Sequence, residues 1–267
     1  MLRSVFLKSL RDQTRSLLWW LFGVVAYIVF VMLFYPTLRQ NSELLNDYLQ
    51  AFPEAFRLAF IGEVEDITSP NGFLASYVFS LIMPIILLVY AIIAGGDAIA
   101  GEEERGTLDL LLANPVSRSR VYLEKAANVA AGVLLISLAT WASVVLGALP
   151  VDMSVSALRV AEVCVSLALF GLALGALALA VGAATGKKGT AGGVAAAVAL
   201  FSYLMYSFAP SVAALRPYRA VSLLYLYNGA DPLSNGLNLV HLTMLVAFTV
   251  ACVAVGLYFF RRRDLAV

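Results

Sequence analysis

The stretch GEEERGTLDLLLANPVSRSR, from Gly101 to Arg120, places three glutamates and an arginine beside long apolar runs of the same chain. A charged side chain at the centre of a bilayer costs about 2.5–3.5 kcal/mol on insertion scales. Glu102, Glu103, Glu104 and Arg105 together would cost on the order of 10 kcal/mol there. The stretch must therefore lie in water, although the sequence on both sides of it is apolar enough to enter a membrane.

The composition of the chain is that of an integral membrane protein. Of 267 residues, 61% are hydrophobic and 13% are charged, against about 25% charged in an average soluble domain. The net charge of +1 gives no basic field for nucleic acid. His241 is the single histidine, and Cys164 and Cys252 lie in apolar runs. We therefore expect no nucleic-acid partner, no metal, no cofactor and no catalytic site in this chain.

Six segments are long and apolar enough to cross about 30 Å of hydrocarbon, which takes about 20 helical residues. The sequence thus predicts an all-α integral membrane protein, with six transmembrane helices in a single domain over 1–267. The first apolar run is too long for a signal-peptide core and is interpreted as a retained span. The predicted spans are about 17–35, 73–95, 128–149, 163–185, 190–210 and 240–260.

The distribution of Lys and Arg predicts the orientation. If both termini lie on one side of the membrane, that side holds 13 of the 18 Lys and Arg residues. The positive-inside rule then puts both termini in the cytoplasm, as in a cell (plasma or inner) membrane protein. An even number of spans agrees with this, and it makes the stretch between the second and third spans cytoplasmic.

The loop between the first two spans, about 36–72, is expected outside and is acidic. Its apolar residues recur at three- and four-residue steps, which is typical of short amphipathic helices at the outer interface. A packed extracellular lid over the spans would explain the same spacing. The recurring residues are Leu45, Leu49, Phe52, Phe56 and Phe60.

The charged residues of the spans argue against an ion-driven secondary carrier, which would place a carboxylate or a broken helix near the midplane. The ionisable residues near the spans lie at their ends: Asp97, Arg159, Glu162 and His241.

Two glycine-containing strings have structural interpretations. GAATGKKGT, from Gly182 to Thr190, is one residue too short for a phosphate loop and has Lys188 in place of the hydroxyl residue. It therefore predicts a tight turn between spans, with lysines at the lipid headgroups and no ATP site. Gly171 and Gly175 favour close helix packing inside one subunit, with a dimer seam as the alternative.

Turn and cap signals predict a short helix over about 108–113. Thr107 suits its N-cap, and Pro115 ends it because the residue before proline avoids helical backbone. Ser117 suits the N-cap of the next helix. The leucines Leu108, Leu111 and Leu112 share one helix face. Periodicity alone allows this face either to bind a protein or to rest on lipid.

The string GEEERGTLDLLLANPVSRSRVYLEK resembles the cytoplasmic segment of ABC-2 type transporter permeases. That segment has a glutamate run, Gly-Thr-Leu, a leucine pair, Pro-Val and a basic residue before the third span. The string NGFLASYVFS at the start of the second span and the ending FFRRRD are also similar to this family, as are the length and the six-span layout.

The resemblance implies the membrane-spanning subunit of an ABC exporter. Two permease subunits would pair, as a homodimer or a heterodimer, in contact with membrane lipid. Each would bind a separate ABC ATP-binding subunit, which holds ATP and Mg²⁺. The short helix would insert into a groove of that subunit and transmit its closure to the spans. The residues carried over as coupling contacts are Glu102, Glu103, Glu104, Arg105, Gly106, Thr107, Leu108, Leu111, Leu112, Pro115 and Arg118.

The cargo expected from the apolar spans is an apolar or amphipathic molecule such as a drug, lipid or peptide. A non-transporting membrane scaffold, which uses the motion of an ATPase to act on a partner protein, is the alternative function. An ion-driven carrier is the weaker alternative.

Overall fold

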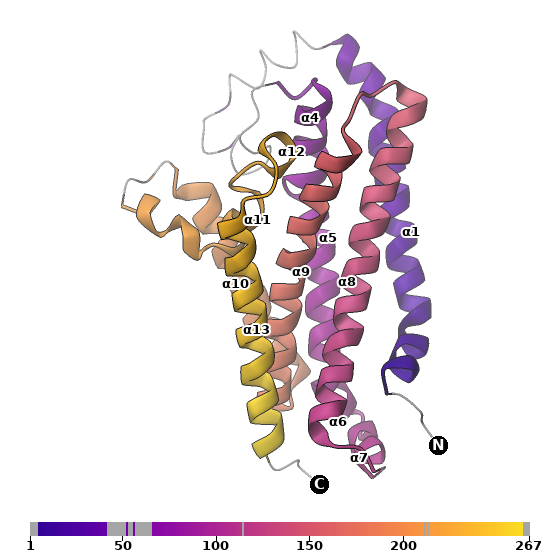
Figure 1. The fold of residues 1–267 in the computed structure, drawn as a ribbon, viewed down its shortest axis with the longest axis vertical. Coiled ribbons are helices and arrows are strands. Elements are labelled where there is room, and N and C mark those ends of the chain that lie inside the picture. The colour runs from indigo at the N-terminus through magenta and orange to yellow at the C-terminus, as the bar shows by residue number, and fades with distance from the viewer. Residues whose placement is uncertain are drawn as a thin grey trace.

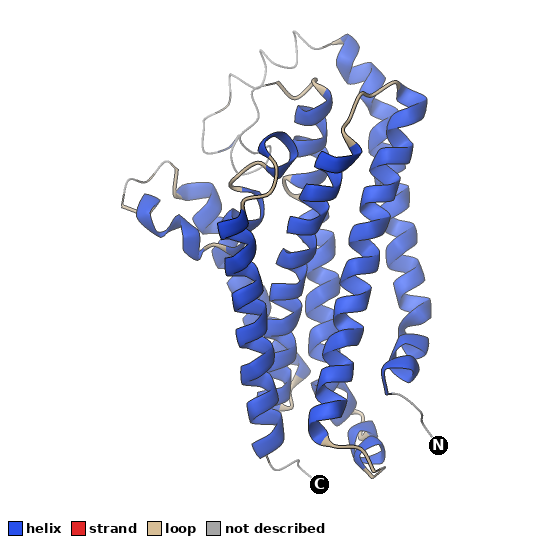
Figure 2. Cartoon of the chain, in the orientation of Figure 1, coloured by secondary structure: helices blue, strands red, loops and turns tan. Residues whose placement is uncertain are grey.

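The computed structural model describes residues 5–41, 52, 56, 66–113, 115–210, 212 and 214–263, and all its regular elements there are helical (Figure 2). Within these ranges, six helical stretches are long and apolar enough to cross a membrane. Each overlaps one predicted span. The prediction of an all-α protein with six membrane-length helices is therefore confirmed.

The long helices lie alongside one another along the longest axis of the molecule (Figure 1). The elements labelled η1 and η2 are π-helical, and η3 and η4 are 3₁₀ turns. In chain order the elements are α1 (Val5–Gln40), α4 (Pro70–Phe73), η1 (Leu74–Phe79), α5 (Ile82–Gly96), η2 (Asp97–Gly101), α6 (Glu102–Glu104), α7 (Thr107–Leu112), α8 (Arg118–Ala148), η3 (Leu149–Val151), α9 (Ala157–Thr185), α10 (Lys188–Phe208), η4 (Arg216–Val221), α11 (Leu223–Asn228), α12 (Pro232–Asn235) and α13 (Leu239–Arg262).

Helix α9 is the centre of the bundle. It packs against α5, α8, α10 and α13, and 78% of its most apolar window is buried, against 17% for α13. The outer helices expose large apolar side chains, such as Phe22 and Leu33 on α1 and Val250 on α13. A surface this apolar suits lipid as the surrounding solvent, because lipid tails are as apolar as these side chains.

Glycines bring α5 and α9 together. A Cβ at Gly95 of α5 would collide with the carbonyl oxygen of Gly175 on α9. A Cβ at Gly171 would lie 2.8 Å from a methyl carbon of Leu87 on α5. Gly171 and Gly175 therefore pack against the chain's own α5, as the small residues of tightly packed membrane helices do. The prediction of close packing inside one subunit is confirmed.

The second span is interrupted near its start. The π-helical segment η1 is followed by Leu81, whose φ of −132° breaks the helix before α5. Tyrosine hydroxyls satisfy two carbonyls of η1, since Tyr27 donates to Tyr77 O, and Tyr227 donates to Phe79 O at 2.8 Å. A non-helical backbone is tolerated in a membrane where protein groups bond it. No acidic residue of this span lies between positions 70 and 96.

The first loop lies mostly outside the described residues. The predicted amphipathic or lid structure around Leu45, Leu49 and Phe60 falls there. Phe52 and Phe56 are described, and their rings stack with centroids 4.9 Å apart.

Candidate functional site at the charged end of the bundle

The polar stretch around Gly101–Arg120 turns the chain at one end of the bundle, where α1 begins and α13 ends (Figure 1). Here α5 continues into η2 and α6, α7 follows after a turn, and α8 leads back along the bundle. We call this region, residues 97–125 with 186–188 and 261–263, the charged end. The short helix predicted over about 108–113 is present as α7.

The turn between α6 and α7 depends on a glycine. Gly106 has a left-handed backbone, with φ 68°, and occupies the N-cap position of α7. Glycine adopts this conformation without the penalty that a Cβ brings. The prediction that Thr107 caps the helix is wrong, because Thr107 is its first residue and its hydroxyl donates to Glu102 O at 3.1 Å.

Each of the three glutamates of α6 contacts a different helical segment. Glu102 forms an ion pair with Lys125 of α8. Glu103 forms one with Arg263, directly after α13. Glu104 accepts a hydrogen bond from the backbone N–H of Lys188, at the start of α10, at 2.7 Å.

The Glu102–Lys125 pair is shielded from water, since Lys125 is only 4% exposed. Charges buried in this way are costly unless they are paired. Hence α6 joins the ends of α8, α10 and α13.

Asp97 adds a second link to α10. Its carboxylate accepts two hydrogen bonds from Arg105, at 2.9 and 3.2 Å, and one from Lys188 Nζ at 2.8 Å. The hydrogen bond to Asp97 raises the pKa of Arg105 above its ordinary value. Arg105 therefore stays charged, and the α6–α7 turn is held against the end of α5. Lys188, expected at the lipid headgroups, binds a carboxylate of its own chain.

The leucines of α7 face the protein itself. Leu108 is 0% and Leu111 is 4% exposed, and both belong to the main hydrophobic core, while Leu112 is half-buried against it. Sequence spacing placed all three correctly on one face. Periodicity left this face open either to a protein or to lipid, and in the structure the core of the same chain covers Leu108 and Leu111.

The start of α8 completes the charged end. Ser117 Oγ accepts from Arg120 N at 3.3 Å, which confirms the predicted cap. Arg118 donates to the backbone carbonyl of Arg263 at 2.7 Å, beside the Glu103 ion pair. Pro115 is exposed, as are Gly106 and Thr107. Among the described residues from 104 to 117, the exposed ones are therefore 104–107, 109, 113, 115 and 117.

The turn between α9 and α10 supports this arrangement. Gly186 has φ 70° and caps α9, and α10 begins at Lys188, so the predicted tight turn is confirmed. A Cβ at Gly186 would lie 2.7 Å from Glu103 Oε1. Among the described residues, no three His, Cys, Asp or Glu side chains come close enough together to hold a metal ion.

Sequence reasoning did not assign three members of this cluster, Lys125, Lys188 and Arg263, to the site. Each is a basic residue at the end of a predicted span, and that position is the only signal they carry. Span ends commonly hold lysine and arginine for orientation alone. Their carboxylate partners are 23 to 160 residues away along the chain, so tertiary structure was needed to pair them.

The chain matches a known family over nearly its whole length. The family model described as ABC-2 family transporter protein matches residues 3–265. No curated protein matches the chain. Members of this family are transmembrane subunits, not normally catalytic, that work with an ABC ATP-binding subunit. The chain belongs to the ABC-2 transporter family, and it is a multi-pass membrane permease subunit of an ABC transporter.

Proposed function

We propose that the chain is the permease of an ABC exporter for an apolar or amphipathic cargo, and that its charged end docks on a separate ATP-binding subunit. The charged end then faces the cytoplasm of the cell membrane, and ATP and Mg²⁺ bind to the partner. The count of 13 of 18 Lys and Arg residues on that side supports this orientation. Two copies of the permease pair in the complete transporter.

One observation carries the proposal: α6 binds α8, α10 and the end of α13 through its three glutamates. The segment also follows α5 through η2 without a break in the helical backbone. A force that the ATP-binding subunit exerts on the exposed surface of α7 is therefore transmitted to the ends of four membrane-length helices together. The buried leucines hold α7 on the bundle, so that a push moves helices instead of bending the turn.

This division of roles revises which residues touch the partner. We assign docking to the exposed surface, with Gly106, Thr107, Pro115 and the acidic Asp109 among its residues. Glu102, Glu103, Arg118 and the buried leucines act as positioning residues that transmit the motion.

A charge placed on the exposed surface tests the docking. Ala113 is exposed at the end of α7. In Ala113→Arg, a long cation should block close approach of the ATP-binding subunit and lower its recovery in a detergent pull-down by about tenfold or more, which corresponds to about 1.4 kcal/mol. The matched control is Ala157→Arg, because Ala157 is exposed and is the first residue of α9, which begins at the opposite end of the bundle (Figure 1). Recovery at the control's level for Ala113→Arg would overturn the docking proposal.

A further inference from the structure

One face of α13 carries a groove of about 430 Å³ next to the charged end. Of the six membrane-length helices among the described residues, α13 is the least buried, with 17% of its most apolar window covered. The residues of the groove recur at three- and four-residue steps, so they share one face of the helix. They are Ala254, Leu257, Tyr258, Arg261 and Arg262.

The opposite face of α13 is packed against the bundle. Gly256 and Phe260 are buried there. A Cβ at Gly256 would lie 2.2 Å from the hydroxyl oxygen of Tyr122 on α8 and 2.7 Å from Cα of Ala180 on α9. This close approach fixes the rotation of α13 about its own axis, and the groove therefore stays on the outside of the bundle, where lipid surrounds it.

The two arginines of the groove are not neutralised by the described residues. Arg263 binds Glu103, whereas Arg261 and Arg262 are exposed and form no ion pair with any residue that the structure describes. Asp264 follows them in the sequence and lies outside the described residues. Three arginines outnumber the two carboxylates even when Asp264 is counted, so the end of α13 keeps a net positive charge.

Tyr258 positions one of the two guanidinium groups. Cζ of Arg262 lies 4.4 Å from the centroid of the Tyr258 ring. A guanidinium over a ring uses its face for this contact, and its N–H groups point outward in its own plane. The same fork of N–H groups matches the oxygens of a phosphate. The ring therefore holds Arg262 in place while its donors stay available.

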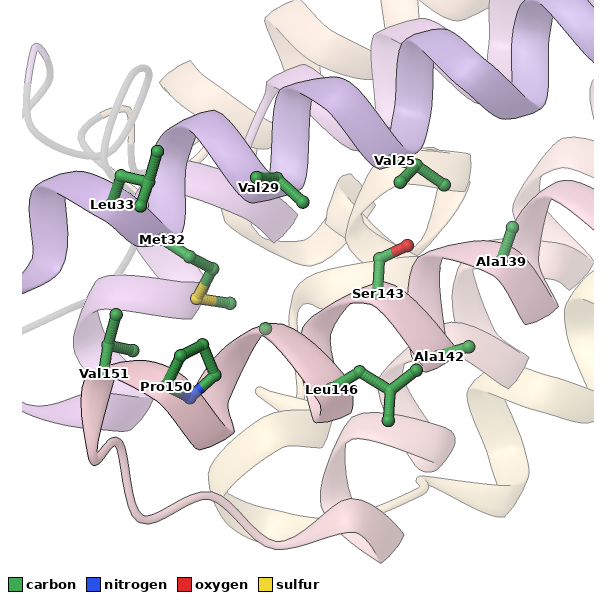
Figure 3. Close-up of a pocket in the computed structure, with 11 residues that line it drawn as sticks. Val25, Val29, Met32, Leu33, Ala139, Ala142, Ser143, Leu146, Pro150 and Val151 are labelled. Carbon is green, nitrogen blue, oxygen red and sulfur yellow. The ribbon is translucent and has the colours of Figure 1, made fainter.

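The groove changes from apolar to cationic along the helix axis. Ala254 and Leu257 lie about two turns and about one turn before Arg261, toward the middle of the membrane-length helix. Arginines at a helix end also complement the helix dipole and set orientation, but neither role requires an apolar groove beside them. By contrast, the larger groove of about 560 Å³ between α1 and α8 is lined by uncharged side chains such as Val29 and Leu146 (Figure 3), so no charge there selects a ligand.

We propose that the groove on α13 binds an anionic phospholipid, with its phosphate at Arg261 and Arg262 and the start of an acyl chain along Leu257 and Ala254. A zwitterionic lipid carries an ammonium group near its phosphate, which the arginines repel. In the orientation proposed above, the groove lies in the cytoplasmic leaflet, whose anionic lipids attract basic segments next to membrane helices. The lipid is a ligand of α13 and not the exported cargo. Bound there, it steadies the end of α13 beside the ion pair with α6.

A fluorescent label above the groove tests the proposal in phosphatidylcholine nanodiscs, without the ATP-binding subunit. In a background without Cys164 and Cys252, Val250→Cys carries a bimane label, because Val250 is exposed about one turn before Ala254 and does not line the groove. Phosphatidylglycerol with a nitroxide on its acyl chain should quench this label saturably. The mole fraction required should be about fivefold or more below that of phosphatidylcholine with the same nitroxide chain. Nanodiscs offer the same lipids in both leaflets, so the result does not depend on the orientation of the chain.

Two pairs of substitutions locate the effect. Arg261→Gln with Arg262→Gln should remove the preference for the anionic lipid. The matched control is Arg11→Gln with Arg15→Gln, which removes two exposed arginines from α1 at the same end of the bundle and should keep the preference. A bimane label at Leu134→Cys, exposed on α8 outside the groove, should be quenched equally by both lipids.

The outcomes separate a site from a general attraction of anionic lipid. Equal quenching of the label at position 250 by both lipids would overturn the proposal, as would a full preference in the variant without the two groove arginines. A preference of the same size at position 134, or one lost equally in the α1 control, would assign the effect to net charge and would also overturn it. The comparison of the two lipids needs only the labelled chain, so it decides the question even where a glutamine variant fails to fold.

Discussion

At the scale of single residues, the charged end contains buried charged side chains, and an ion-pair partner offsets the cost of removing each charge from water. Lys125 is almost fully buried, and its ammonium binds Glu102. By contrast, Arg120 binds Glu124 one turn along the same exposed helix face, at 2.8 Å. The two pairs use the same chemistry, but only the first holds two different helices together.

Replacing Lys125 should therefore cost more than replacing Arg120. In Lys125→Met the Glu102 carboxylate loses its buried partner, and we expect a loss of about 1–3 kcal/mol of stability. In Arg120→Met an exposed pair disappears, for about 0–1 kcal/mol. Thermal unfolding midpoints of the two variants in detergent give the comparison. The double variant Lys125→Met with Glu102→Gln should recover part of the loss, and equal midpoints for the two single variants would contradict the role assigned to this pair.

At the scale of elements, the helical geometry of the second span changes along its length. The regular helix α5 lies between π-helical η1 and π-helical η2. π-Helical segments often mark functional positions in helices. Here η2 leads into the glutamates of α6, and η1 is bonded by tyrosines of α1 and α11. Both ends of α5 are thereby held by neighbouring helices.

The hydrogen bond from Tyr227 to Phe79 O should be measurable as stability. Tyr227 is fully buried, so Tyr227→Phe leaves a buried carbonyl without its donor, at a cost of about 1–3 kcal/mol. Tyr218→Phe is the control, because that ring is largely exposed on η4. Unfolding of both variants in detergent should show a lower midpoint for Tyr227→Phe alone. A midpoint equal to that of the control would mean that this bond does not stabilise the break.

At the scale of the whole molecule, the bundle is polarised. One end gathers α6, α7 and the basic ends of α8, α10 and α13, whereas the middle exposes apolar side chains on α1, α10 and α13. Such a molecule has one orientation in a membrane, and the charge count supports the proposed one, with the charged end in the cytoplasm.

Single-cysteine labelling tests this orientation. In a background without Cys164 and Cys252, a cysteine at position 187 should stay unlabelled by a membrane-impermeant maleimide in intact cells. A cysteine at position 152, exposed in the turn between α8 and α9 at the opposite end, should be labelled. Permeabilised cells, in which both should react, provide the control. Labelling at 187 but not at 152 would reverse the orientation.

The amino-acid sequence by itself determined the class of fold, because each membrane span has to satisfy its own backbone with local hydrogen bonds. Hydropathy and length therefore located six spans, and the cap at Ser117, the α9–α10 turn at Gly186 and the short helix α7 also followed from local signals. The Thr107 cap was predicted wrongly because two neighbouring residues are both suited to precede the helix. Gly106, with its left-handed backbone, occupies the N-cap position, and Thr107 is the first residue of α7.

Tertiary structure alone decided what the charged stretch touches. The three glutamates are equivalent in sequence, yet they bind Lys125, Arg263 and the backbone of Lys188, on three separate segments. Local rules likewise put Leu108 and Leu111 on one face but could not say that the chain's own core covers it. Ion pairs and burial between distant segments depend on which helices become neighbours, and that choice of neighbours has no short-range pattern in the sequence.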